Sequence, residues 1–292
     1  MRLRKKELGF CFLNFLLVTG TELTWGENAG LFSQSILRNR DGILRRIKNG
    51  PSEKIPEFFK FDPRSKQDPQ DLDKLNQGIY NYILKNFGVE VTNPPSPIRL
   101  YPTEMQSYGS YRIKQKTLEG EYDIVVKQAD DFIKNGFLKA SELGIASKNA
   151  EFVESKYKID PVNYTTTGYV ISYYFDGKQL SNFVFDVDSL IKNQWIFESL
   201  GIKLAILKKE GVEYKERIDS NVLIDIKGRD LRILGYGNFG ARDPVEQIYA
   251  FIYTYLLQEL RKEKKEGFAD SFWLIFKNAY NSQLPPEMHI RK

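Results

Sequence analysis

The stretch from Gly211 to Gly240 constrains the fold of this chain more than any other part of its sequence. A charged turn contains Glu216, and Asn221 stands five residues later, at the start of a short apolar run. A polar turn around Gly228 separates this run from a second one, which leads to Gly235. Two short apolar runs joined by a polar turn with glycine predict a hairpin of short strands. We therefore expect a charged turn, a hairpin and a glycine-rich turn in this order.

Histidine and cysteine are nearly missing. The chain has one His, His289 in the C-terminal tail, and one Cys, Cys11 near the start. A lone tail His cannot complete a Ser–His or Cys–His catalytic pair, and no zinc site of Cys and His ligands can be built. Any chemistry must run on carboxylates, Lys and other polar side chains, which excludes many hydrolases.

Length and charge give broad limits. The 292 residues, 41% of them apolar, allow one large domain or two small ones with a real core. The net charge of +5 is mild, and four basic residues stand among the first six positions, so the body is closer to neutral. Aromatic residues are spread out, without the clusters typical of nucleic-acid-binding domains. We expect no nucleic-acid partner.

The first 26 residues are typical of an export signal. Basic residues from Arg2 to Lys6 precede an apolar run from Leu8 to Val18, which only Asn14 interrupts. The run is too short to span a membrane comfortably. We expect a signal peptide or an uncleaved anchor, hence a periplasmic or secreted protein of the bacterial envelope that meets a membrane only through this segment. A buried or frayed helix in a cytoplasmic protein is the alternative.

The rest of the chain divides into three parts. Residues 27–97 are a helical extension with a Pro-rich linker, and they end in the sequence NPPSP at positions 93–97. Its helices are expected at 29–48 and 71–87, and we expect them to pack on the main domain rather than to present a docking face. Residues 98–180 are β-rich and residues 181–292 are helical.

Apolar patterns place the elements of the main domain. Strands are expected at 109–115, 122–127 and 169–175, the first two as an antiparallel hairpin. Helices are expected at 129–143, 187–210, 244–264 and 268–281. The order is a β-rich half followed by a helical half.

Four segments together resemble a known superfamily. The run DIVVK ends an apolar strand at Lys127, and YYFDGKQL follows at 173–180. The charged turn and strand at 216–224 come next, and then Asp243-Pro244 within 239–251. In this order they resemble the protein-kinase-like superfamily from about residue 100 to residue 281. The most similar branch contains aminoglycoside phosphotransferases, choline kinases and lipopolysaccharide-core kinases.

The resemblance implies a two-lobed α+β fold, with a small β-rich lobe and a larger helical lobe. In active kinases an Asp of the catalytic loop accepts or orients the substrate hydroxyl proton, and an Asn and a second Asp hold Mg²⁺. The resemblance therefore implies that Lys127 and Asp176 contact ATP, that Glu216 occupies the base position and that Asn221 is a metal ligand.

Departures from the family pattern weaken the expected catalysis. Gly235 replaces the second metal-binding acid, and glycine offers no ligand. The glycine-rich loop retains only Gly109. An acidic partner for Lys127 is not obvious, although three acids lie on or near the next helix, namely Asp130, Asp131 and Glu142. These departures predict a degenerate pseudokinase.

Structural roles are the alternative for the same residues. Asn221 can cap the turn into its strand. Glu216 and Arg217 can form a surface pair, and Asp243 can be the N-cap of a helix whose first residue is Pro244. These readings need no bound nucleotide or metal.

Three functions stay open. The first is a catalytically impaired kinase-like module that is exported and binds or scaffolds an unknown protein or small ligand, without a cofactor and with aromatic residues (Tyr111, Tyr236, Phe239) closing its cleft. The second is an atypical phosphotransferase for a sugar or small hydroxylated substrate, with ATP and Mg²⁺ bound by Lys127, Asn221 and a displaced acid (Asp219, Asp225 or Asp243). The third is an envelope α+β protein unrelated to kinases.

Overall fold

The computed structural model describes residues 55–100, 109–160, 165–237 and 240–291. Contacts divide the chain into two units, Met1–Ser52 and Glu53–Lys292, and the described residues all belong to the second unit. The predicted export signal at 1–26, the predicted helix at 29–48 and Phe239 lie outside the described residues.

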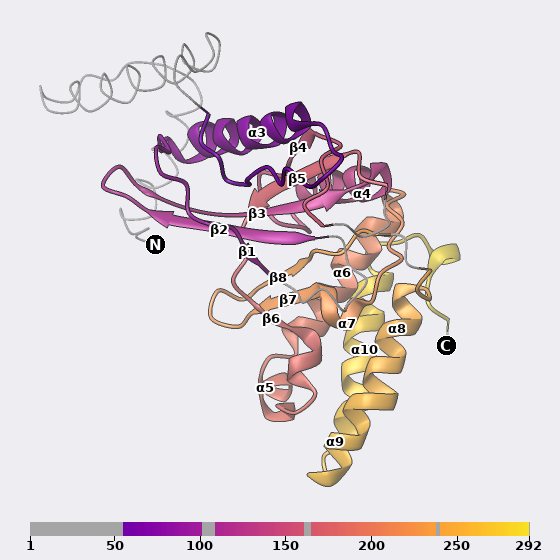
Figure 1. The fold of residues 1–292 in the computed structure, drawn as a ribbon. Coiled ribbons are helices and arrows are strands. Elements are labelled where there is room, and N and C mark those ends of the chain that lie inside the picture. Colours follow the sequence, from indigo (N-terminus) through magenta and orange to yellow (C-terminus); the bar gives the residue numbers. More distant parts are fainter. Residues whose placement is uncertain (1–54, 101–108, 161–164, 238–239, 292) are drawn as a thin grey trace, which may run out of the picture. The chain divides into compact units, whose positions relative to one another are not determined.

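A five-stranded antiparallel sheet forms the β-rich part of this unit (Figure 1). The strand order is β1-β2-β3-β5-β4. The predicted hairpin is confirmed, since β2 pairs with β3 in a register that places Arg112 opposite Val125. The bounds are β1 Ile98–Arg99, β2 Ser110–Lys116, β3 Glu121–Ala129, β4 Glu151–Glu154 and β5 Gly168–Tyr173.

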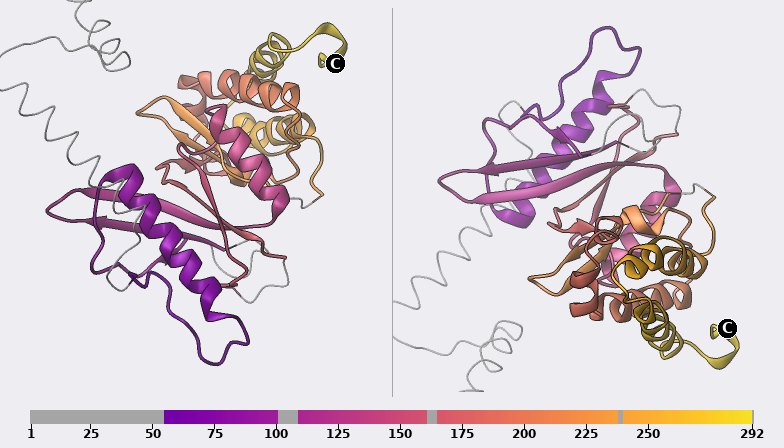
Figure 2. Two further views of the ribbon diagram at one scale, coloured as in Figure 1. Left: turned by 90° about the horizontal axis from the view of Figure 1, so that it is seen from above. Right: turned by 90° about the horizontal axis from the view of Figure 1, so that it is seen from below.

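Helix α3, Pro69–Phe87, covers one face of the sheet (Figure 2). Asp68 accepts a hydrogen bond from the N–H of Gln70, and Gly88 ends the helix with a φ of 70°. The apolar face of α3 shares a hydrophobic core with alternate residues of β2, β3 and β5. The described part of the predicted extension therefore packs on the sheet, and the predicted boundary at 93–97 lies within one packed unit.

Helix α4, Asp131–Glu142, follows β3 and packs into the core of the helical part. Asp130 is its N-cap and accepts a hydrogen bond from the N–H of Ile133 at 2.8 Å. Arg232 donates to the carbonyls of Gly144 and Ala146 just beyond the helix, so the carboxyl end of α4 is tied to the helical part.

The helical part is built around a pair of long helices, α6 and α10. At Gly201 the two approach so closely that a Cβ would lie 2.5 Å from the carbonyl oxygen of Phe276. A three-stranded sheet, β6-β7-β8, lies beside them. The helices are α5 Val187–Lys192, α6 Trp195–Lys209, α7 Ile218–Asn221, α8 Pro244–Ala250, α9 Leu257–Lys262 and α10 Gly267–Asn281, and the strands are β6 Lys178–Gln179, β7 Val222–Asp225 and β8 Asp230–Ile233.

Two helix predictions need correction. The single helix expected at 187–210 is two helices, because Asn193 ends α5 with a φ of −118°. The helix expected at 244–264 is continuous from α8 to α9, but it contains a π-helical stretch at Phe251–Leu256. His289, in the C-terminal tail, is half-buried, and its Nε2 contacts the carbonyl of Leu284 at 2.8 Å.

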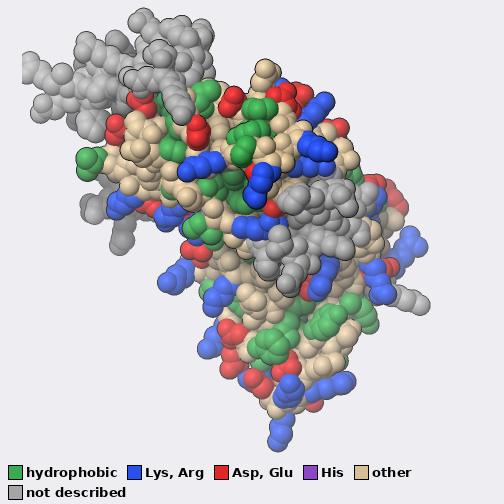
Figure 3. Space-filling model, in the orientation of Figure 1, with side chains coloured by type: hydrophobic (Ala, Val, Ile, Leu, Met, Phe, Trp, Pro, Cys, Tyr) green, Lys and Arg blue, Asp and Glu red, His purple; other side chains and the backbone are tan. Residues whose placement is uncertain are grey.

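The described unit has the α+β, two-lobed fold that the sequence predicted. None of its described helices is both long and apolar enough to cross a lipid bilayer. On the face shown in Figure 3, basic and acidic side chains are interspersed.

Candidate functional site

The loop after α6 and the β7–β8 hairpin bring the predicted site residues together. Gly211 turns the chain after α6 with a φ of 69°, and short helix α7 ends at Asn221. Gly228 closes the hairpin turn by donating its N–H to Asp225 at 3.0 Å. Because the N–H of Leu234 donates to the carbonyl of Asn221 at 2.9 Å, the end of β8 lies against the start of β7. Gly235 follows directly.

Gly235 has no room for a side chain. A Cβ at this position would lie 2.3 Å from Oε2 of Glu216 and 2.5 Å from Cγ of Asn221. The side chains of Glu216 and Asn221 therefore fill the space that a metal-binding acid at position 235 would need. The sequence has glycine where an active kinase has a metal-binding acid. The structure shows that the side chains of Glu216 and Asn221 pack against this glycine.

Glu216 points into the protein. Its side chain is 8% exposed, its Oε1 accepts a hydrogen bond from the backbone N–H of Gly237, and the same oxygen lies 4.0 Å from Nζ of Lys127. The expected surface pair of Glu216 with Arg217 is wrong: Glu216 is buried, and Arg217 pairs with Asp219 at 2.6 Å. The contacts with Gly237 and Lys127 are both made by Oε1 of Glu216, and the other carboxylate oxygen, Oε2, lies next to Gly235.

Lys127 reaches this site from β3 in the other lobe. Its Nζ donates to the carbonyl of Leu234 at 3.4 Å and pairs with Glu216. The acid that meets Lys127 is therefore Glu216 rather than one of the acids near α4. Those acids have other roles: Asp130 caps α4, Asp131 accepts a hydrogen bond from Thr167, and Glu142 pairs with Lys139.

Asn221 has a structural bond of its own. Its Nδ2 donates to the carbonyl of Arg217 at 2.9 Å, which satisfies a backbone acceptor of the short helix α7. This contact agrees with the capping role that the sequence allowed. Asn221 lies beside Glu216 and Gly235, and this bond uses its amide nitrogen, while the amide oxygen Oδ1 lies toward Gly235.

Tyr236 fills the space next to Gly235. Its ring packs edge-on against Phe137 of α4, with ring centroids 5.7 Å apart, and against Tyr214 at 5.8 Å. Its hydroxyl is buried and has no hydrogen-bond partner among the described residues, and burial raises the pKa of Tyr236 well above its ordinary value. The ring of Tyr236 therefore packs between α4 and the loop that carries Tyr214. Tyr111 does not close the cleft, because it packs against Phe59 in the core beneath α3.

Asp176 lies in the turn between β5 and β6 and is exposed. Nearby, the guanidinium of Arg112 lies 3.6 Å from the ring centroid of Tyr174 and makes two hydrogen bonds to Asp123, at 2.8 and 2.6 Å. Hydrogen bonding to Asp123 raises the pKa of Arg112. No sequence motif predicted this cluster, although Arg112 stands opposite β3 in the predicted hairpin.

The site offers fewer oxygen ligands than the Mg²⁺ ion implied by the resemblance would meet in an active kinase. Mg²⁺ usually takes one or two carboxylates beside water and phosphate. Gly235 supplies no side-chain oxygen, and Oε1 of Glu216 already contacts an N–H and a cation. Oε2 of Glu216 and Oδ1 of Asn221 are the described oxygens that remain beside Gly235. Asp219 pairs with Arg217 and Asp225 holds the hairpin turn, while Asp243 lines a cavity that neither Glu216 nor Asn221 lines. No group of three or more His, Cys, Asp or Glu residues placed to hold a metal occurs among the described residues.

Comparison with known proteins finds similarity to solved structures. No family model matches this chain, and no curated protein matches it in sequence. Among solved structures, it is similar to the kinase domain of maize SIRK1 (sucrose-induced receptor kinase 1) bound to AMP-PNP, at 14% identity, over 68% of this chain and 93% of that one, with a TM-score of 0.41. The kinase domain of Mycobacterium tuberculosis PknI is also 14% identical, over 68% and 98%, with a TM-score of 0.39.

Proposed function

We propose that this protein is a catalytically impaired, kinase-like module that acts by binding rather than by transferring phosphoryl groups. The observation that carries the proposal is the packing around Gly235, where Glu216 and Asn221 occupy the space of a metal-binding acid. The two-lobed fold and the convergence of Lys127, Glu216 and Asn221 support the kinase-like part of the proposal.

The chemistry of phosphoryl transfer explains why this packing matters. The reaction depends on positioned metal ions that neutralise charge on the transferred group, and on an acid that orients the attacking hydroxyl. Here Glu216 accepts an internal hydrogen bond and pairs with Lys127 through one oxygen, Oε1. Among the described residues, Gly235 stands where a second carboxylate would hold the metal.

Lys127 is restrained by the same pair. Its Nζ lies 4.0 Å from Oε1 of Glu216 and 3.4 Å from the carbonyl oxygen of Leu234. An ammonium group has three N–H donors, so it can contact a phosphate without leaving Glu216. The pair therefore holds Lys127 at the site and does not by itself exclude a nucleotide.

Thermal unfolding in the presence of nucleotide tests the proposal. The purified protein is heated with ATP alone, with ATP and Mg²⁺, and with ATP and Mn²⁺. A ligand at about 100 times its Kd stabilises the folded state by about 2.7 kcal/mol, a readily visible shift. We expect no metal-dependent shift, whereas a kinase domain that retains both acids, measured in parallel, shows one.

Two variants make the test specific. Asn221→Ala should leave the response to ATP and Mg²⁺ unchanged, because Asn221 holds no metal in the proposed module. A metal-dependent shift that Asn221→Ala abolishes would overturn the proposal in favour of an atypical phosphotransferase. A metal-independent shift that Lys127→Met removes would support a module that binds nucleotide without using it.

Export is part of the proposal and rests on the sequence of the first 26 residues alone. Cleavage of this segment places the module outside the cytoplasm, where ATP is scarce, and this location agrees with a binding role. Sequencing the amino terminus of the protein isolated from its native cells shows whether the segment has been removed. A cytoplasmic protein that keeps residues 1–26 would contradict this part.

A further inference from the structure

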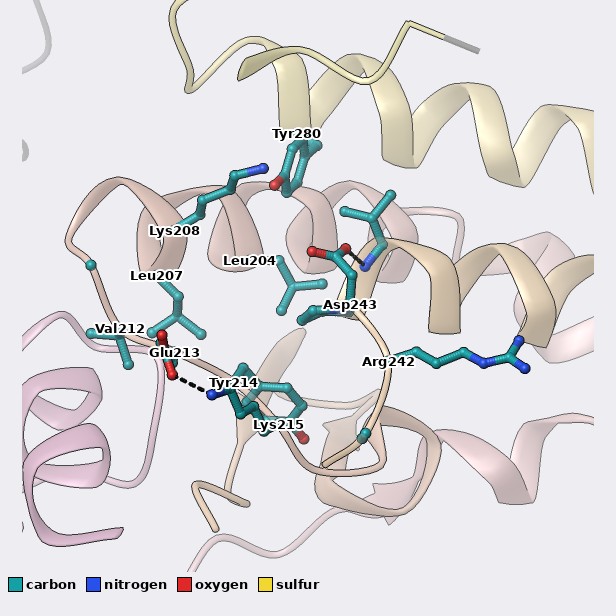
Figure 4. Close-up of a pocket in the computed structure, with 14 residues that line it drawn as sticks. Leu204, Leu207, Lys208, Val212, Glu213, Tyr214, Lys215, Arg242, Asp243 and Tyr280 are labelled. Atoms are coloured by element: carbon teal, nitrogen blue, oxygen red, sulfur yellow. Dashed lines mark hydrogen bonds and ion pairs between the residues drawn. The ribbon is translucent and has the colours of Figure 1, made fainter. Parts of the chain in front are cut away.

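A cavity of about 420 Å³ lies in the helical part, apart from the Lys127–Glu216 site (Figure 4). Its walls come from the second half of α6, the loop at 211–215, the segment at 241–245 that begins α8, and Tyr280 of α10. This volume lies within the range of about 300–1,000 Å³ that is typical of small-molecule sites. None of Lys127, Glu216, Asn221 and Gly235 lines it.

The cavity has an apolar floor. Leu204 and Leu207, on one side of α6, are buried, and Val212 and Val245 are half-buried beside them. The ring of Tyr214 adds a buried aromatic wall. A ligand therefore gains affinity by placing an aliphatic or aromatic group against these side chains.

Two opposite charges face the cavity. The ammonium of Lys208 lies 5.7 Å from the ring centroid of Tyr280, at one end of the opening, and the carboxylate of Asp243 lies across from it in Figure 4. Within the described part of the chain, neither has an ion-pair partner, and the carboxylate of Asp243 binds the N–H of Val245 through Oδ1.

The other charged residues of the cavity either pair with each other or point away from it. Glu213 and Lys215 pair with each other at 2.7 Å. Arg242 extends away from the cavity in Figure 4. The available electrostatic pattern is therefore one cation, one anion and an apolar surface between them.

We propose that this cavity binds a small zwitterion with an apolar side chain, the chemistry of a free amino acid such as leucine. The ligand carboxylate lies against Lys208 and the hydroxyl of Tyr280, its ammonium group faces Asp243, and its side chain covers Leu204 and Leu207. A ligand that carries a single charge leaves one of the two protein charges facing an apolar group, which costs affinity. This inference does not depend on the kinase-like proposal, because none of Lys127, Glu216, Asn221 and Gly235 lines the cavity.

Isothermal titration calorimetry on the full chain tests the proposal with three probes of one shape. Leucine carries both charges, 4-methylpentanoate lacks the ammonium group, and 3-methylbutylamine lacks the carboxylate. We expect leucine to bind with a Kd at least tenfold lower than either truncated compound, since each charge-assisted hydrogen bond is worth about a factor of ten or more.

Variants assign the two charges. Asp243→Asn keeps a side chain that caps α8 but removes the anion, so leucine should bind about tenfold more weakly while 4-methylpentanoate is unaffected. Lys208→Gln should weaken leucine and leave 3-methylbutylamine unaffected. Arg242→Gln, which also removes a charge beside the cavity but points away from it, is the matched control and should change nothing.

Two results would overturn the proposal. The first is a lack of saturable binding for leucine and for phenylalanine, a larger zwitterion of the same class. The second is equal binding of leucine and its truncated analogues. Lys127→Met should leave leucine binding intact, so a failure here is distinct from a failure of the kinase-like proposal.

Discussion

At the scale of single residues, the site is defined by Gly235 and by the side chains of Glu216 and Asn221 that surround it. The kinase-like resemblance implied a shared site for Glu216, Asn221 and position 235, and in the structure the three residues are neighbours. The sequence could not predict that Lys127 would pair with Glu216. That contact joins two lobes, and no local pattern encodes a distance between them.

Restoring an acid at position 235 should not restore the site. Gly235→Asp places a Cβ 2.3 Å from Oε2 of Glu216, and its carboxylate would also meet a buried carboxylate of the same charge. Overpacking alone costs about 1–3 kcal/mol in folded cores. We expect a loss of at least this size in the free energy of unfolding, measured by urea denaturation.

A second glycine provides the control for this prediction. A Cβ at Gly267, the first residue of α10, meets nothing within 4 Å, so Gly267→Ala should be neutral or stabilise by up to about 1 kcal/mol. A Gly235→Asp variant as stable as the wild type, or one that gains a metal-dependent response to ATP, would show that Glu216 and Asn221 can move aside.

At the scale of elements, α3 is an integral part of the sheet layer. The periodicity of its apolar residues predicted the helix and its apolar face, and both are confirmed. Its position over β4 and β5 could not be predicted, since an apolar stripe fits any apolar surface of similar size. The break between α5 and α6 was missed for a related reason: Asn193 and Gln194 interrupt a pattern that continues on both sides.

Gly78 marks the closest approach of α3 to the sheet. In an isolated helix, Gly78→Ala would stabilise by about 1 kcal/mol. In this fold a Cβ at position 78 would lie 2.5 Å from both Cγ atoms of Val153, a β-branched residue on β4 that is stiff at χ1. We therefore expect Gly78→Ala to destabilise the protein by about 1–3 kcal/mol in urea denaturation.

Truncating the neighbour separates a clash from other causes. Val153→Ala removes both Cγ atoms that the new methyl group would meet. The double variant should therefore be more stable than the sum of the single changes predicts, with a coupling energy of about 0.5–3 kcal/mol. Additive effects would mean that α3 shifts freely over β4.

At the scale of the whole described unit, the sequence predicted the order of elements better than their contacts. Alternating apolar residues predicted the β2–β3 hairpin and β5, and helical periodicity predicted α4, α6 and α10. The cavity between α6, α10 and the start of α8 is formed by segments distant in sequence, and no sequence motif predicted it. No motif predicted the burial of tyrosine hydroxyl groups in the two lobes either.

These tyrosines should make the fold sensitive to alkali. Burial raises the pKa of Tyr122 to about 12, and it raises the pKa values of other tyrosines further, among them Tyr82, Tyr169, Tyr214 and Tyr236. In the unfolded chain a tyrosine titrates near pH 10. Stability is therefore undiminished below about pH 10 and falls as the pH rises toward 12, because only the unfolded chain releases these protons readily.

Urea denaturation at a series of pH values from about 8 to 11.5 measures this loss, and the ultraviolet absorbance of tyrosinate follows the protons directly. Tyrosinate from the buried residues should appear together with unfolding and not before it. Tyr122→Phe removes one titrating group, whose hydroxyl donates to Oε1 of Gln115 at 2.7 Å, so the fall of stability with pH should become less steep. If all tyrosines instead ionise near pH 10 in a protein that remains folded, water reaches these hydroxyl groups and the two cores are more open than their packing indicates.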